Sequence, residues 1–220
     1  MSDGLKGLAV ATQRRIEALY ALEAQAPVAD FLIPAGSAGS LPGGGSRTLV
    51  TCEGGELSLG VVLEEGVVER LAAQDPRQGL HRDNLAAYCT LTEEVSHFVY
   101  LGYCARHGRL TTQLELELVG EVDKYLAAAD LLSLQSEGAL SKQLRELLFR
   151  RYSLAEGLSP EQTDRYHRAS GLAERYCGWL ESAFLETRRP AELNREARRF
   201  YRLGRGDKLA RIAGLVSSRD

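Results

Sequence analysis

Helical periodicity across residues 83–132 constrains the fold of this chain more than any other feature. Apolar side chains recur at intervals of three and four over residues 85–102 and again over 114–132, and this spacing gathers them on one face of an α-helix. The segment 106–109, Arg-His-Gly-Arg, interrupts the pattern. The sequence therefore predicts two consecutive long helices, the first of which we expect Asp83 to cap.

An alternative exists for the start of the second helix. Residues 114–118 alternate apolar and charged side chains, as a half-buried strand does. Because the three- and four-residue spacing continues well beyond residue 118, we favour a helix.

The second half of the chain continues in the same way. A shorter helix is expected over 138–151. Ser159, Pro160 and Gln162 then occupy the positions of an N-cap, a first helical residue and a capping-box partner, and the apolar spacing behind them extends to about residue 187. Three long helices and one shorter helix are typical of a helical bundle.

The first third of the chain is mixed. Residues 5–22 predict an amphipathic helix, residues 28–33 are compatible with a strand, and the runs 47–52 and 56–63 predict a hairpin joined by Gly-Gly. Gly, Ser and Pro dominate residues 34–46, which predicts a loop. A strand rather than a helix follows this loop, so we interpret it as a connection and not as a phosphate-binding loop.

These patterns predict a mainly α protein, a helical bundle with a small β-containing N-terminal section made of a hairpin or three short strands. We divide the chain into an N-terminal helix with short strands and the Gly-rich loop (1–76), a helical bundle (77–187) and a basic C-terminal helical segment (188–220), with a single domain as the alternative. A chain of 220 residues is long enough to bury a sizeable core.

Composition and cysteine usage indicate where the protein is found. No apolar run approaches the roughly 18 residues that span a bilayer, and the N-terminus lacks the basic-then-apolar pattern of a signal peptide. The four cysteines are widely spaced and include no Cys-x-x-Cys, which is typical of reduced thiols. We therefore expect a cytoplasmic protein that does not associate with membranes.

Glu94 and His97 form the one Glu-x-x-His spacing in the sequence. Residues three apart on a helix project to nearly the same side, and metal sites in helical bundles combine such pairs from neighbouring helices. The following helix offers Glu117 or Glu121 as a further ligand, and the ligand set that we predict is Glu94, His97 and Glu121. Neutral imidazole and ionised carboxylates suit iron, manganese or zinc.

Two observations oppose this site and favour solvated or half-buried polar residues. The second motif of such sites occurs here only as Asp164-x-x-His167, with the shorter carboxylate. On a helical wheel of about 100° per residue, His97 lies roughly 160° from Val95, the centre of the apolar stripe. The wheel therefore predicts that His97 is on the polar side of its helix.

The charge of the chain is uneven. Residues 188–220 contain ten Lys and Arg against four Asp and Glu, which leaves 17 basic and 26 acidic residues in 1–187. The basic segment has three interpretations, which we rank as docking onto the acidic body, binding of a protein partner, and binding of nucleic acid. Nucleic acid is third because the pI of about 5.9 is far below that of dedicated nucleic-acid-binding domains. The candidate partner-binding residues are Arg195, Arg198, Arg199, Arg202 and Arg205.

Two functional hypotheses follow from the sequence. The first is a cytosolic protein-interaction or accessory protein that acts through helical faces and the basic C-terminal segment. The alternative is a carboxylate/His metal-binding bundle, either oxidoreductase-like or for metal storage. No catalytic residue is assigned, and the sequence leaves open whether the protein is an enzyme.

Overall fold

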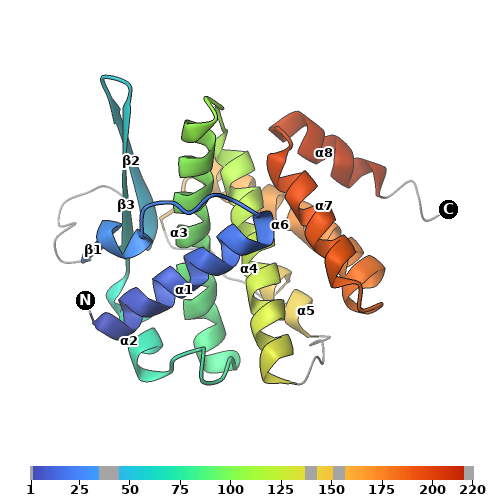
Figure 1. Cartoon of the computed structure of the whole chain (residues 1–220), viewed down its shortest axis with the longest axis horizontal. Helices are drawn as coiled ribbons and strands as arrows, with labels where there is room; N and C mark the ends of the chain where they lie inside the picture. The colour runs from blue at the N-terminus through green and yellow to red at the C-terminus, as the bar shows by residue number, and fades with distance from the viewer. Residues whose placement is uncertain (1, 35–44, 137–142, 151–156, 216–220) are drawn as a thin grey trace.

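Helices make up most of the structure, and a small sheet lies on its N-terminal side (Figure 1). The computed structural model describes residues 2–34, 45–136, 143–150 and 157–215. Within these residues the α-helices are α1 (Asp3–Tyr20), α2 (Glu65–Ala73), α3 (Arg82–Arg106), α4 (Gln113–Gln135), α5 (Leu144–Phe149), α6 (Pro160–Leu180), α7 (Pro190–Arg202) and α8 (Arg205–Gly214). A π-helical turn, Glu181–Leu185, extends α6. The mainly α prediction is confirmed.

Three strands form the sheet in the order β1-β3-β2. Strands β2 (Arg47–Glu53) and β3 (Glu56–Leu63) are the predicted hairpin, and β1 (Leu32–Pro34) pairs in parallel with the end of β3. Both residues of the turn, Gly54 and Gly55, have positive φ, at 59° and 86°. This combination defines a type I′ turn, whose twist matches that of two antiparallel strands.

The segment expected to be extended over 28–33 is only partly so. Val28–Phe31 forms a 3-10 turn, and the pairing with β3 begins at Leu32. Of the predicted loop over 34–46, the structure describes only residues 34, 45 and 46, since residues 35–44 are outside the described residues.

The predicted N-cap of α6 is confirmed, whereas the predicted N-cap of α3 is wrong. Ser159 and Gln162 make the predicted capping box of α6. At α3, however, the N-cap is His81, whose amide donates to Asn84 Oδ1 at 2.9 Å, and not the expected Asp83. Asp83 lies in the first turn of α3, where a negative charge favours the helix N-terminus.

The other two helix predictions have clear outcomes. Residues 114–118 are helical as favoured, and Thr112 caps α4 by accepting the Glu115 amide at 3.3 Å. The helix expected over 138–151 is α5, Leu144–Phe149, while residues 138–142 and 151 lie outside the described residues.

Helix α3 is enclosed by other elements of the fold. It packs against α4, α1, α2 and the sheet, and α1 crosses both α3 and α4 in Figure 1. Helix α6 packs against α4. A single cluster of buried apolar side chains runs from Leu5 in α1 to Leu215 behind α8. Because α3 has neighbours on several sides, several of its polar residues are buried as well as its apolar ones.

The basic C-terminal segment packs onto the body of the protein. Tyr201 of α7 stacks on Tyr20 of α1 with ring centroids 3.9 Å apart. Arg198 Nε donates to the Leu19 carbonyl at 2.9 Å, and Arg202 Nη2 donates to the Tyr20 carbonyl at 3.0 Å. These carbonyls belong to the last turn of α1, where helical partners are missing and cations are favourable. Within the described residues, no helix is both long and apolar enough to cross a membrane.

Candidate metal centre

Helices α3 and α4 bring His97 together with several carboxylates. Glu93 and His97 lie one turn apart on α3, and Glu117 lies on the facing turn of α4. One potential ligand atom from each of these three residues lies within 4.8 Å of the other two. The packing of the two helices therefore assembles a His and two carboxylates at one point in the bundle.

His97 is buried, with 7% of its surface exposed. Its Nε2 lies 3.7 Å from Glu117 Oε2, and its Nδ1 lies 3.8 Å from Glu94 Oε2. These separations are too long for hydrogen bonds. Among the described residues, neither His97 Nε2 nor Glu117 Oε2 has a hydrogen-bond partner, although buried polar atoms of this kind are nearly always paired.

Gly120 of α4 lies beside the imidazole of His97, where a side chain would crowd the ring. A Cβ on Gly120 would lie 3.0 Å from His97 Nε2 and 3.4 Å from Glu93 Cγ, closer than ordinary side-chain contacts. Any larger residue at this position of α4 would press on the face of the imidazole that points toward Glu117. The absence of a side chain at position 120 is therefore part of the site.

Glu94 connects the site to the β-hairpin. The Thr48 hydroxyl on β2 donates to Glu94 Oε2 at 2.8 Å, and this same oxygen is the one nearest His97 Nδ1. In metal sites, a carboxylate that accepts a hydrogen bond from one imidazole nitrogen orients the ring and leaves the other nitrogen for the ion. Glu94 lies beside Nδ1 but at 3.8 Å, beyond the length of such a bond. Glu94 thus has the position of a supporting residue, with Nε2 directed toward Glu117.

Two cations accompany the carboxylates. Lys124 Nζ donates to Glu93 Oε2 at 2.9 Å and to Glu121 Oε1 at 2.8 Å. Arg165 Nε, on α6, lies 3.8 Å from Glu117 Oε1. The four carboxylates at positions 93, 94, 117 and 121 therefore outnumber the two permanent cations, so the cluster has an excess of negative charge when all four are ionised and His97 is neutral.

Burial and these charges shift the pKa values of the site. Burial alone would lower the pKa of His97, but Glu94 and Glu117 raise it to about 9. Burial raises the pKa of Glu117 to about 7, against the effect of His97 and Arg165. Burial would also raise the pKa of Glu93, yet the Lys124 ammonium keeps it below its usual value. Shifts of this kind concentrate at functional sites, although internal ion pairs produce them too.

The three predicted ligands do not all lie together in the structure. Glu94 and His97 are adjacent in the site, whereas Glu121 is held by Lys124 one turn away along α4. Asp164 and His167 are exposed on α6 and lie outside the cluster. The helical wheel was wrong about His97, because α4 covers the side of α3 that the wheel marks as polar.

Glu93 and Gly120 were not found from the sequence. Glu93 could have been found from its four-residue spacing to His97. Like the three-residue spacing of Glu94 and His97, this spacing puts two side chains on one face of a helix. Gly120 lies three residues after Glu117 within a strongly helical run, and a glycine inside a helix costs stability unless packing requires it.

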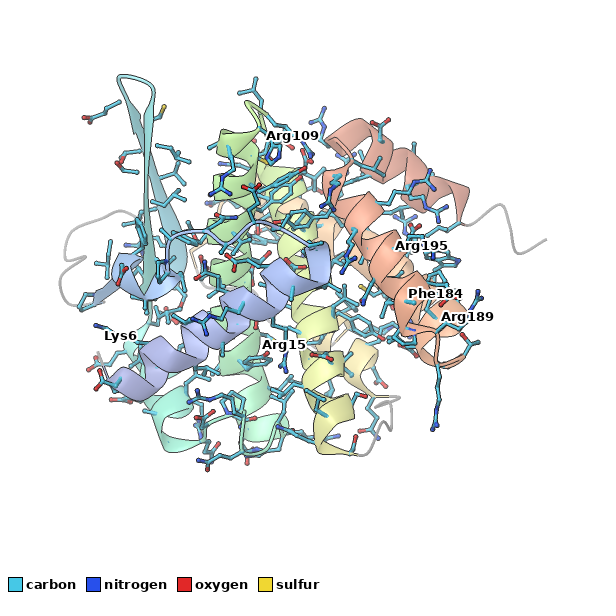
Figure 2. All side chains as sticks on the ribbon, in the orientation of Figure 1. Lys6, Arg15, Arg109, Phe184, Arg189 and Arg195 are labelled. Carbon is cyan, nitrogen blue, oxygen red and sulfur yellow. The ribbon has the colours of Figure 1, made fainter. Side chains whose placement is uncertain are left out.

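A second buried polar cluster is fully hydrogen-bonded. Lys208 of α8 has no exposed surface, and its Nζ donates to the Tyr100 hydroxyl at 2.9 Å and lies 3.1 Å from Glu115 Oε1. Arg109, which lies in the connection between α3 and α4 and is labelled in Figure 2, pairs with the same Glu115 oxygen at 2.5 Å. Because its polar groups are paired, we interpret this cluster as structural.

Comparison with known proteins found no match to a protein family, to a curated protein or to a solved structure. The site is therefore interpreted from its own geometry and chemistry.

Proposed function

We propose that the protein binds one divalent transition-metal ion between α3 and α4. The ligands are His97 through Nε2, Glu117 through Oε2, and Glu93. The observation that carries this proposal is the pair of buried atoms, His97 Nε2 and Glu117 Oε2, which face each other at 3.7 Å without hydrogen-bond partners among the described residues.

The donor set and the spacing support this proposal. Metal–nitrogen and metal–oxygen bonds to zinc are about 2 Å long, so two ligand atoms on one ion are about 3 to 4 Å apart. The distance of 3.7 Å falls in this range. One imidazole with two carboxylates suits zinc, iron or manganese, as the sequence predicts.

The local charge also supports a cation. With His97 neutral and the four carboxylates ionised, the cluster holds four negative charges against the two positive charges of Lys124 and Arg165, and a divalent ion would offset this excess. A bound ion would supply Lewis acidity, or electron transfer if it is iron or manganese. Glu94 would hold the ring through Nδ1, and Gly120 would keep the approach to Nε2 clear.

A competing explanation uses the same residues. A protonated His97, whose raised pKa of about 9 favours the charged form, would lie between Glu94 and Glu117 as an internal ion pair. Metal content separates the two explanations. Untagged protein, purified without chelators, should retain about one equivalent of zinc, iron or manganese through gel filtration, as measured by elemental analysis. Protein that is metal-free and takes up none of these ions on reconstitution would overturn the proposal.

Variants then test the ligand set. His97→Gln and Glu117→Gln should lose the metal while keeping the helical circular-dichroism spectrum. Glu121→Gln is the matched control, because Glu121 lies on the same helix as Glu117 but outside the group of Glu93, His97 and Glu117, whose potential ligand atoms lie within 4.8 Å of one another. If Glu121→Gln loses as much metal as Glu117→Gln, the ligand set proposed here is wrong.

A second candidate function is binding of an acidic protein partner by the C-terminal helices. Arg198 and Arg202 donate to carbonyls of α1, whereas the predicted residues Arg195, Arg199 and Arg205 are exposed on α7 and α8. Figure 2 labels Arg195 on α7. Loss of a co-purifying acidic protein from an Arg195→Glu, Arg199→Glu variant, with the fold retained, would support this second candidate function, and unchanged binding would remove it.

We propose a cytoplasmic location for both candidate functions, since all four cysteines are free thiols.

A further inference from the structure

The outer edge of β2 has backbone groups available for pairing. In the sheet order β1-β3-β2, strand β2 is at the edge, and within the described residues β3 is the one strand that pairs with it. The hairpin extends past the neighbouring helices in Figure 1. Residues Val50, Thr51, Cys52 and Glu53 of β2 are exposed.

The turn determines which backbone groups point outward. A two-residue type I′ turn places Glu53 and Glu56 as a hydrogen-bonded pair. Hydrogen-bonded and non-bonded pairs alternate along an antiparallel ladder, and the register from Arg47↔Val62 to Glu53↔Glu56 contains no bulge. The amides and carbonyls of Thr48, Val50 and Cys52 therefore point away from β3, toward the free edge.

This edge lacks the features that prevent strand pairing. Edge strands are usually protected by charged side chains, Lys above all, by Pro, by a bulge or by very short length. The two charged residues of β2, Arg47 and Glu53, are at its two ends and leave the middle of the strand uncharged. Strand β2 has seven residues with neither Lys nor Pro. Its exposed apolar side chain, Val50, is 47% exposed, and Leu57 on β3 is 36% exposed.

The sequence of β2 is complementary to itself in the antiparallel direction. If two copies pair about Val50, then Val50 faces Val50, Thr48 faces Cys52, and Arg47 faces Glu53 of the other copy. In this register the two copies pair through the amides and carbonyls of Thr48, Val50 and Cys52, which are the groups that point outward. Each end of the paired strands carries one Arg47–Glu53 pair of opposite charge. A two-fold axis through Val50 therefore satisfies both the hydrogen bonds and the charges.

We propose that β2 is a homodimerisation edge that pairs antiparallel with β2 of a second copy of this chain, centred on Val50, to give a continuous six-stranded sheet. The proposal is independent of metal binding, because it depends on the hairpin edge and not on α3 and α4.

Charge reversal tests both the partner and the register. Wild-type protein should approach the mass of a dimer in sedimentation equilibrium as its concentration is raised. Arg47→Glu alone and Glu53→Arg alone should each dissociate more readily by about tenfold or more, because each variant places like charges at both ends. An equimolar mixture of the two variants should form a heterodimer, since Arg47 then faces Glu53 and the introduced Glu faces the introduced Arg. Wild-type protein that is monomeric at every concentration, or a mixture no tighter than the single variants, would overturn the proposal.

A backbone variant tests the edge itself. Val50→Pro removes an amide that points outward, so the β2–β3 ladder is retained while the dimer is lost. Val50→Thr is the matched control, since it keeps the amide and the branched side chain, and it should remain dimeric. A Val50→Pro protein that is folded and still dimeric would place the interface elsewhere.

Crosslinking tests the register directly. In a Cys52→Ser background, Val50→Cys should form an intermolecular disulfide under mild oxidation, because directly opposed residues lie within disulfide range. The natural Cys52 should not crosslink, since Thr48 faces it and the two Cys52 residues are about 13 Å apart at 3.3 Å per residue. Crosslinking through Cys52 and not through position 50 would contradict this register.

Discussion

Lys208 Nζ lies 3.1 Å from Glu115 Oε1, and both side chains are buried although they are 93 positions apart in the sequence. The pair joins α8 to the start of α4, and Tyr100 of α3 accepts a hydrogen bond from the same ammonium. Arg109 shares the Glu115 oxygen. This contact explains how the last helix of the chain is fixed to the bundle.

We expect Glu115→Gln to destabilise the protein by about 3 kcal/mol or more, because removing one member of a buried ion pair leaves the other charge uncompensated. The free energy of unfolding in urea measures this change. Glu192→Gln is the control, since Glu192 pairs with Arg189 at the surface, where solvent screens the pair and its contribution to stability is small. Similar losses of unfolding free energy in both variants would show that the buried pair contributes no more to stability than the surface pair.

Lys208 should make stability depend on pH in the alkaline range. Burial lowers its pKa to about 8 despite the neighbouring Glu115, whereas an unfolded lysine titrates near 10.4. Burial thus disfavours the charged form, and this cost is fully present below pH 8 and disappears as pH rises toward 10.4. Relative to Lys208→Met, the wild type should become more stable by a few kcal/mol across this window, since one pKa unit corresponds to about 1.4 kcal/mol. Parallel stability curves for the two proteins would contradict the lowered pKa.

Gly120→Ala should weaken zinc binding by about tenfold or more, because the added Cβ would lie 3.0 Å from His97 Nε2 and displaced ligands of this kind lose affinity on that scale. Competition with a chelating dye measures the affinity. Gly171→Ala is the control, since a Cβ there meets no atom within 4 Å, and it should leave affinity unchanged while stabilising α6 by about 0.5–1 kcal/mol. Zinc affinity that is equal in both variants would argue against the site.

Arg198→Ala and Arg202→Ala should each lower the free energy of unfolding by about 1 kcal/mol, because each removes a hydrogen bond to the C-terminal carbonyls of α1. Arg195→Ala should change it by less than about 0.5 kcal/mol, as exposed substitutions generally do. Equal effects of all three substitutions would mean that docking on α1 does not depend on these contacts.

The fold was predictable where the information is local. Ser159 and Gln162 predicted the capping box of α6, and Gly54 and Gly55 predicted the hairpin, because each arrangement is completed within four residues. The cap of α3 was placed incorrectly at Asp83, since His81 and Asn84 can cap each other and the sequence offers several polar residues there.

The candidate site was predictable only in part. The spacing of Glu94 and His97 pointed to the turn of α3 at which the carboxylates gather, but Glu121 was predicted where Glu117 and Glu93 form the group with His97. Residues 117 and 121 lie one turn apart on α4, and sequence does not give the height at which two helices pack. The relative shift of α3 and α4 decides which carboxylate faces the imidazole.

The sequence by itself determined the main helices, the capping box of α6 and the hairpin, because hydrogen bonds and side-chain periodicity within each segment are sufficient to select them. Only the tertiary structure decided which polar residues are buried. A helical wheel assigns one apolar face to a helix, whereas α3 is covered by α1, α4 and the sheet, so His97 is buried on a side that the wheel marks as polar. The burial of His97, the lack of hydrogen-bond partners for His97 Nε2 and Glu117 Oε2 among the described residues, and the Lys208–Glu115 contact depend on which elements surround a residue. That arrangement follows from the packing of the whole chain.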